Sequence, residues 1–177
     1  IKLFYENPMS FKKLVLVRHA KSSWNEPHVD DHDRQLNQRG LKNAPEMGLR
    51  LKNQGFSPDY VETSTALRAF STAKIICQEI NFNLQRIIKN PNLYLASIST
   101  WLEIIGKLNN DYNSVMLFGH NPGITSLVNQ VWGLPIDNVP TCGMIILEFE
   151  KIKWEKTISV IPKVAQFDFP KNESKKN

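Results

Sequence analysis

Two short apolar runs limit what this chain can fold into more than any other feature of its sequence. Leu14-Val15-Leu16-Val17 and Val115-Met116-Leu117-Phe118 are apolar at every position, without the alternation of a half-exposed strand. Runs of this length and composition are typical of central strands that are covered on both faces. Because such strands need helices above and below them, the two runs predict an α/β protein.

Helical patterns separate the expected strands. Apolar residues recur at helical spacing at 41–51, 69–80, 101–108 and 124–131. Pro45 should kink or shorten the first of these helices. The expected helix ends are Asn37 as a cap and Gly55 as a stop, Ser64 or Thr65 as the second cap, Thr100 with Glu103 as a capping box, and Gly133 as the last stop.

Three further segments are expected to be strands. Tyr60–Thr63 follows Pro58 and precedes the second helix, whereas Met144–Phe149 and Thr157–Ile161 flank a charged stretch of hairpin length. Alternating strands and helices followed by a hairpin predict a three-layer α/β sandwich. Its central sheet should be largely parallel, with an antiparallel edge hairpin.

Length and charge narrow the class of protein. The 177 residues, 41% of them hydrophobic, suit one domain. We expect this domain at 9–165, a non-native or flexible extension at 1–8 and a basic tail at 166–177. No apolar run reaches the roughly 18 residues of a membrane span. The basic residues are scattered despite a net charge of +5, so neither a membrane nor nucleic acid is an expected partner.

The two cysteines indicate a reducing environment. Cys77 and Cys142 have neither the paired spacing of a disulfide framework nor that of a metal site. The first residues also lack the basic start and long apolar stretch of a secretory signal. We therefore expect a cytoplasmic protein.

Cationic side chains stand where the expected strands end. Arg18 and His19 come directly after the first apolar run, Arg68 lies in the first turn of the second helix, and His120 follows the second apolar run. Because the carboxyl ends of parallel strands meet at one edge of a sheet, we expect these side chains to converge. Like charges repel at close range, so an anion should sit between them, and phosphate is the natural occupant.

Four motifs surround these residues in a fixed order. They read VLVRHAKSSW at 15–24, DRQLNQRG at 33–40, STALRA at 64–69 with Thr72-Ala73, and GHNPG at 119–123. The set resembles the histidine phosphatase superfamily and, within it, the SixA-type phosphohistidine phosphatases. The resemblance extends from about Lys13 to Phe149. That family usually has glycine where this chain has Ala20, a small change that should leave the neighbouring histidine unaffected.

The resemblance implies a role for each cationic residue. His19 would be the nucleophile and pass through a phosphohistidine intermediate, while Arg18, Arg68 and His120 would bind the phosphoryl oxygens. We also expect Ser22 to contact the substrate. Neither a metal nor a cofactor is implied, and inorganic phosphate or sulfate should fit the site.

The chemistry of an attacking imidazole adds two expectations. The attacking nitrogen of His19 must be unprotonated, so its other nitrogen should be fixed by a hydrogen bond, often to a backbone carbonyl. His120, in contrast, would serve better as a cation.

The general acid is the least defined part of the expected site. Many relatives carry glutamate after the third strand, where this chain reads Leu93-Tyr94-Leu95-Ala96. Asp31, Asp33 and Glu103 are the remaining options, and each also has an ordinary structural explanation. The nitrogen of a phosphoramidate is readily protonated, so a missing acid favours phosphohistidine over a sugar phosphate as substrate.

One pattern competes with the phosphate site. His28 and His32 lie four residues apart among Asp30, Asp31 and Asp33, which could suggest a metal site. The segment lacks apolar periodicity, so we interpret it as a solvated loop that binds no metal.

Three functions remain open at this point. The first is a phosphatase that acts on phosphohistidine in a protein, the second a small-molecule phosphomonoesterase with the same site, and the third a weakly active phosphate-binding signalling module. The short span from 73 to 92 and the modest loop at 21–35 leave no room for a large cap. An open site of this kind would admit a protein side chain, which favours the first.

Overall fold

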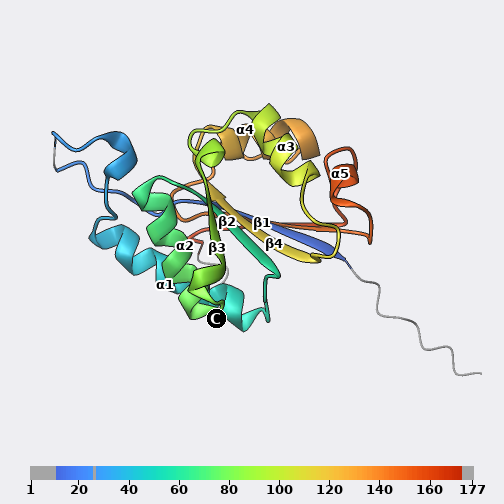
Figure 1. Cartoon of the computed structure of the whole chain (residues 1–177), viewed down its shortest axis with the longest axis horizontal. Helices are drawn as coiled ribbons and strands as arrows, with labels where there is room; N and C mark the ends of the chain where they lie inside the picture. Colours follow the sequence, from blue (N-terminus) through green and yellow to red (C-terminus); the bar gives the residue numbers. More distant parts are fainter. Residues whose placement is uncertain (1–10, 26, 173–177) are drawn as a thin grey trace, which may run out of the picture.

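The computed structural model describes residues 11–25 and 27–172, and within them six strands form one mixed sheet (Figure 1). The strand order is β3-β2-β4-β1-β5-β6; the first four strands run parallel, and β5 and β6 are antiparallel to their neighbours. The prediction of a largely parallel sheet with an antiparallel edge is confirmed. The strands are β1 Lys12–Arg18, β2 Tyr60–Ser64, β3 Ile87–Asn90, β4 Ser114–Gly119, β5 Met144–Phe149 and β6 Val164–Asp168.

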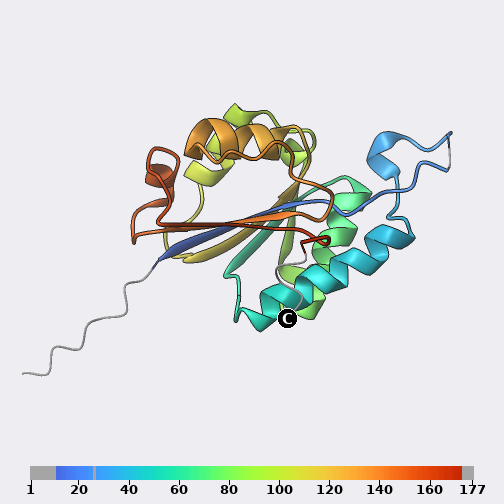
Figure 2. The same ribbon diagram turned by 180° about the vertical axis from the view of Figure 1, so that it is seen from behind.

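Helices cover both faces of the sheet (Figures 1 and 2), which confirms the three-layer sandwich. α1 and α2 pack together on one face, and α3, α4 and α5 lie on the other. Short 3-10 helices occur in the connections. The bounds are α1 Gln38–Asn53, α2 Leu67–Glu79, α3 Ile98–Gly106, α4 Gly123–Trp132, α5 Trp154–Thr157, η1 Asp31–Asp33, η2 Leu84–Arg86 and η3 Pro91–Leu93. In the described part of the chain, no helix has both the length and the apolarity needed to cross a bilayer.

β1 divides its side chains between two cores. Val15 and Val17 pack with residues of α1 and α2, whereas Leu14 and Leu16 pack with residues of α3, α4 and α5. All four side chains are fully buried. Because successive residues of a strand point to opposite faces, an uninterrupted apolar run suits only a strand between two helical layers.

The antiparallel edge involves different residues from those expected. The predicted strand Thr157–Ile161 is wrong, because α5 begins at Trp154 and the pairing strand is β6. Trp154 is fully buried and donates its indole N–H to the carbonyl of Tyr112 at 2.9 Å. Ile161, in contrast, is 82% exposed. Burial of the large Trp154 ring thus outweighs the strand propensity of the residues that follow it.

The sheet also continues into the segment expected to be a tail. β6 runs to Asp168, and Arg50 of α1 donates hydrogen bonds to Asp168 Oδ1 at 2.9 Å and to the carbonyl of Phe169 at 3.2 Å. The boundary expected at residue 165 therefore falls inside a strand that pairs with β5. The extension expected at 1–8 and the end of the tail at 173–177 lie outside the described residues.

The helix ends match the predictions in three cases. Gly55 follows the last residues of α1 in the left-handed conformation, as expected of a stop. Asn37 caps α1 by accepting the amide N–H of Gly40 at 3.0 Å, and Gly133 ends α4 in the left-handed conformation. α1 continues through Pro45, so the proline does not shorten it.

The caps of α2 and α3 differ from the predictions. Ser97, not Thr100, caps α3, because its hydroxyl accepts the amide N–H of Thr100. Ala66 stands at the start of α2, and the hydroxyl of Ser64 accepts its amide N–H at 3.2 Å. A capping hydroxyl can lie some residues before the first helical turn, which makes these positions hard to assign from spacing.

Candidate active site

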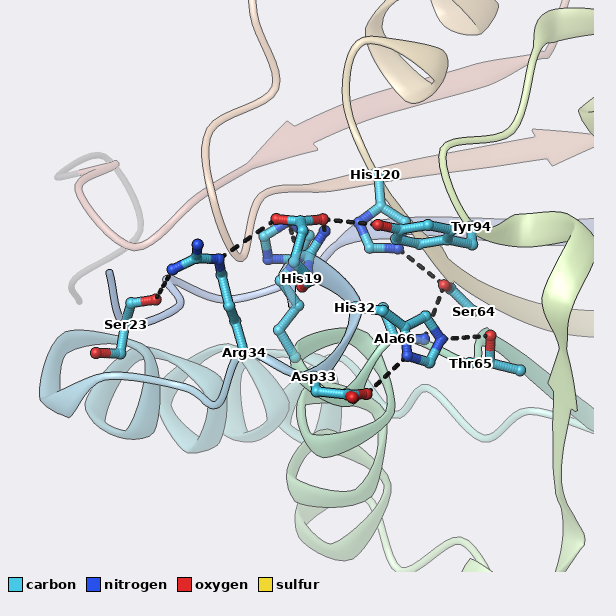
Figure 3. A network of polar contacts seen from close by, with 12 residues as sticks. His19, Ser23, His32, Asp33, Arg34, Ser64, Thr65, Ala66, Tyr94 and His120 are labelled. Carbon is cyan, nitrogen blue, oxygen red and sulfur yellow. Dashed lines mark hydrogen bonds and ion pairs between the residues drawn. The ribbon is translucent and has the colours of Figure 1, made fainter. Parts of the chain in front are cut away.

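The two histidines meet at the carboxyl ends of the central strands. Arg18 of β1 lies opposite Gly119 of β4 in the parallel register, so the next residues, His19 and His120, leave the sheet side by side. Their ring centroids are 5.0 Å apart (Figure 3). Arg68, in the first turn of α2, reaches the same place: its Nε donates to His19 Nε2 at 3.3 Å.

His19 is held as a neutral imidazole. Its Nδ1 donates to the carbonyl of Ala20 at 2.7 Å, which leaves the lone pair on Nε2, the atom that accepts from Arg68. Burial lowers the pKa of His19 to about 4, and the charges of Arg68 and Arg18 act in the same direction. The Ala20 amide in turn donates to Thr72 Oγ1 at 2.9 Å, so α2 fixes the segment that carries the ring. This arrangement suits a nucleophile that attacks through Nε2.

Asp31 binds the guanidinium group of Arg68. Arg68 donates to Asp31 Oδ2 at 2.7 Å and also to the backbone carbonyl of Asp31, and the hydroxyl of Tyr94 donates to the same Oδ2 at 2.8 Å. Burial alone would raise the pKa of Asp31, but the hydrogen bonds from Tyr94 and Arg68 outweigh it and lower the pKa. Asp31 is therefore ionised at neutral pH, and the chain's own carboxylate occupies part of the cationic site.

Besides Nε of Arg34, which lies 3.7 Å from Asp31 Oδ1, two buried nitrogen atoms at the site have no hydrogen-bond partner among the described residues. One is Nε of Arg18, whose NH1 donates to the carbonyl of Val139 at 2.7 Å. The other is Nδ1 of His120, whose Nε2 lies 2.8 Å from the hydroxyl of Ser64. An orphaned N–H is costly in a protein interior, so these atoms suit an oxygen-rich ligand. The oxygens of a phosphate are acceptors of the kind that both atoms lack.

His120 is neutral in this structure, contrary to the expectation that it acts as a cation. Burial, together with the charges of the nearby His19 and Arg68, lowers its pKa to about 3. The edge of its ring packs against the ring of Tyr94, with centroids 5.4 Å apart. A neutral imidazole donates from one nitrogen only, which makes its tautomer important for anion binding.

The remaining expected site residues lie apart from the histidines, except Asp31. Ser22 is buried in an isolated bridge with Leu36, and no hydrogen bond in the described part of the chain joins it to His19. Asp33 is exposed and pairs with His32 at 2.9 Å. Glu103 is exposed on α3 and pairs with Lys107.

The loop that holds the histidines of the competing pattern has no metal-binding geometry. Both ring nitrogens of His32 are hydrogen-bonded, Nδ1 with Asp33 Oδ1 at 2.9 Å and Nε2 with the hydroxyl of Thr65 at 3.0 Å. Among the described residues, no group of three or more His, Cys, Asp or Glu side chains is placed to hold a metal ion.

Sequence reasoning missed Tyr94, Ser64 and Arg34 as parts of the site. The sequence pattern indicates Ser64 only as a possible helix cap, and Tyr94 lies in the stretch where many relatives carry glutamate. The guanidinium group of Arg34 stacks on Trp24 at 4.1 Å, and its Nε lies 3.7 Å from Asp31 Oδ1. The available signal for Ser64 and Arg34 is their position inside two of the four motifs, and Tyr94 has no such signal. Hydrophobic periodicity does not reveal which polar side chains meet in space.

Comparisons with known proteins agree with this geometry. The family model described as the histidine phosphatase superfamily, branch 1, matches residues 14–94. An uncharacterized chloroplastic protein of Arabidopsis thaliana is 27% identical over 157 residues, which cover 84% of this chain and 72% of the relative. A 2,3-bisphosphoglycerate-dependent phosphoglycerate mutase of Borreliella burgdorferi is 41% identical over 70 residues, but these cover 38% of this chain and 28% of the mutase.

Solved structures extend the similarity to almost the whole chain. A protein from Agrobacterium tumefaciens described as a phosphohistidine phosphatase SixA has a TM-score of 0.71 at 28% identity, covering 78% of this chain and 92% of its own. The protein histidine phosphatase SixA complexed with tungstate has a TM-score of 0.73 at 19% identity, covering 89% and 94%, and at this identity supports the fold alone.

Proposed function

This chain is a hydrolase of the histidine phosphatase superfamily, and we propose that it removes phosphate from phosphohistidine in a protein substrate. The observation that carries the proposal is the state of His19: a buried, neutral imidazole whose Nε2 lone pair lies beside Arg68 and His120. Nucleophile and anion-binding groups are thus assembled around one point.

The reaction follows from these contacts in two steps. Nε2 of His19 forms a bond to phosphorus while the bond from phosphorus to the leaving group breaks. Arg18, Arg68 and His120 stabilise the charge on the phosphoryl oxygens, and each such donor is typically worth about a hundredfold or more in rate. Water then attacks the phosphohistidine, which releases inorganic phosphate and restores the free imidazole.

The state of Asp31 favours a leaving group that needs little help from an acid. It lies nearest to the histidines of the three acids considered, yet its pKa is lowered and it is ionised. The nitrogen of a phosphoramidate is protonated more readily than the ester oxygen of an alkyl phosphate. A phosphoramidate therefore depends less on an acid supplied by the enzyme. The segment 91–97 between β3 and α3 is also short and adds no cap. Both features support a phosphohistidine side chain as the substrate.

A second candidate is a small-molecule phosphomonoesterase. The similarity to the phosphoglycerate mutase, an enzyme that acts on small phosphorylated molecules, favours this candidate. That similarity covers only a limited part of either chain. Its substrate would use the same His19 chemistry.

The decisive experiment compares turnover of a phosphohistidine peptide, a phosphoserine peptide and a sugar phosphate. We expect the phosphohistidine peptide to be hydrolysed fastest, and a clear preference for the sugar phosphate would establish the second candidate instead. An aryl phosphate, which leaves without protonation, should be turned over by either enzyme. If phosphate binds but none of the four is hydrolysed, the protein is a phosphate-binding module.

The nucleophile is tested by trapping the covalent intermediate. His19→Ala should abolish the acid-labile, base-stable phosphoryl label on the protein, whereas His28→Ala, which removes an exposed loop histidine, should retain it. Ordinary activity in His19→Ala would mean that another residue is the nucleophile.

A further inference from the structure

Ser64 lies on the side of the His120 ring that faces away from the nucleophile. Its hydroxyl is 2.8 Å from His120 Nε2, and both side chains are buried. Figure 3 shows the His120 ring between Ser64 on one side and His19 on the other. Ser64 is the last residue of β2, so the sheet itself holds the hydroxyl in place.

The hydrogen bonds of Ser64 restrict where its proton can go. A serine hydroxyl has one proton and two acceptor positions. One acceptor position takes the amide N–H of Ala66 at 3.2 Å. If the hydroxyl donates to His120 Nε2, its proton has an acceptor, and His120 Nδ1 is the one ring atom left to donate to a ligand. If Nε2 instead carries a proton and donates to the hydroxyl, the serine proton has no acceptor among the described contacts, which is unfavourable in a buried position.

The location of the proton on His120 decides what the ring offers to a phosphoryl group. Neutral imidazole carries one proton, and Nδ1 is the nitrogen that has no partner within residues 11–25 and 27–172. A protonated Nδ1 donates to a phosphoryl oxygen, whereas a bare Nδ1 presents a lone pair that repels it. Hydrogen bonding at one ring nitrogen sets the state of the other, as in catalytic and metal-binding histidines generally.

We propose that Ser64 is a positioning residue that fixes His120 in the tautomer protonated on Nδ1, so that a neutral ring donates to the phosphoryl group. The proposal deepens the proposed function, on which its kinetic consequence rests. The tautomer itself is a property of the free protein and is tested without any substrate.

The first test is nitrogen-15 NMR of the imidazole rings in the full chain at neutral pH, with His120 assigned by its absence in His120→Gln. We expect the wild-type ring to carry its proton on Nδ1, and Ser64→Ala to lose that preference. A wild-type ring protonated on Nε2 would overturn the proposal, whatever the variant does. An unchanged Nδ1 tautomer in Ser64→Ala would overturn it as well.

The second test separates positioning from a structural role, because Ser64 also supports the start of α2. Ser64→Ala should lower kcat on the substrate that turns over by about tenfold to a hundredfold, and Ser64→Thr, which keeps a hydroxyl, should restore part of it. Thr65→Ala is the matched control, since it removes the neighbouring hydroxyl that binds His32 instead. Equal losses in Ser64→Ala and Thr65→Ala, with an unchanged tautomer, would assign Ser64 to packing. A protein with no turnover but with the expected tautomer shift would retain this inference and reject the proposed function.

Discussion

At the scale of single residues, Asp31 competes with any anion for Arg68. Its carboxylate accepts from Arg68 and Tyr94, which places a negative charge beside the position of the phosphoryl group. Asp31→Asn removes that charge and keeps the shape of the side chain, so inorganic phosphate should bind more tightly, by about tenfold. Calorimetric titration at fixed ionic strength measures the effect.

The neighbouring carboxylate provides the control for this prediction. Asp33 is exposed and pairs with His32, so Asp33→Asn should leave phosphate binding nearly unchanged. Weaker phosphate binding in Asp31→Asn would instead mean that Asp31 orients Arg68 for its ligand.

The two buried histidines make the stability of the protein sensitive to acid. Both have an ordinary pKa near 6.5 that the fold lowers, to about 4 for His19 and about 3 for His120. Above pH 6.5 both rings are neutral in the folded and the unfolded chain. Between pH 6.5 and 4 the unfolded chain binds protons at these rings and the folded chain does not. The free energy of unfolding therefore decreases as the pH is lowered, by about 3 kcal/mol for His19.

Urea unfolding at pH 7 and pH 4.5 measures this loss. His19→Gln, which cannot titrate, should show a smaller decrease than the wild type, and the difference isolates His19 from the other groups. Equal decreases in the two proteins would contradict a strongly lowered pKa for His19. The charge of His19 is one cause of the lowered pKa of His120, so the contributions of the two histidines should not add fully.

At the scale of secondary-structure elements, α4 begins in close contact with the segment before α3. A Cβ atom on Gly123 would overlap the carbonyl oxygen of Ala96 and lie 3.0 Å from the indole nitrogen of Trp101. Gly123→Ala should therefore destabilise the protein by about 1–3 kcal/mol. It should also reduce kcat, because α4 starts three residues after His120 and a displacement of about 1 Å can cost a hundredfold.

A second helical glycine supplies the control. A Cβ atom on Gly106 would approach no other atom closer than 4.0 Å, so Gly106→Ala in α3 should leave kcat unchanged and stabilise by at most about 1 kcal/mol. Chemical denaturation together with steady-state kinetics distinguishes the two variants. Equal behaviour would show that the contact at Gly123 is easily relieved.

Sequence patterns predicted the elements well where a strand is buried on both of its faces or where a glycine ends a helix. The central residues of β1 and β4, 14–17 and 115–118, are apolar at every position because each strand lies between two helical layers. Gly133 ends α4 in a conformation that favours glycine. The strand expected at 157–161 failed because the location of Trp154 depends on Tyr112, which is distant in sequence. Ser64 and Tyr94 escaped detection for the same reason.

At the scale of the whole molecule, β6 completes the sheet beyond the expected domain boundary. Asp168 is buried, and Arg50, which is largely buried, donates to its carboxylate and to the next carbonyl. A chain ending at Ala165 should be less stable than one ending at Asn172, on the order of 3 kcal/mol. Arg50 loses Asp168 and keeps only Glu46 as a carboxylate partner, and β6 loses most of its pairing with β5. Thermal unfolding of the two chains compares them. Equal melting temperatures would restore the boundary at 165.

The depth of the nucleophile has a consequence for the kinetics of any protein partner. His19 is 9% exposed, whereas Trp24 on the following loop is 65% exposed. The phosphorus atom must therefore travel inward while the backbone that bears it stays outside. The distance by which a phosphorylated side chain projects from its protein therefore selects among partners, separately from the type of bond that is cleaved. A partner whose modified side chain lies against its own surface must first extend it. Turnover should depend on how often the phosphorylated side chain extends from the partner's surface. The local mobility of the partner, and not only its affinity, would then set the lifetime of the phosphoryl group.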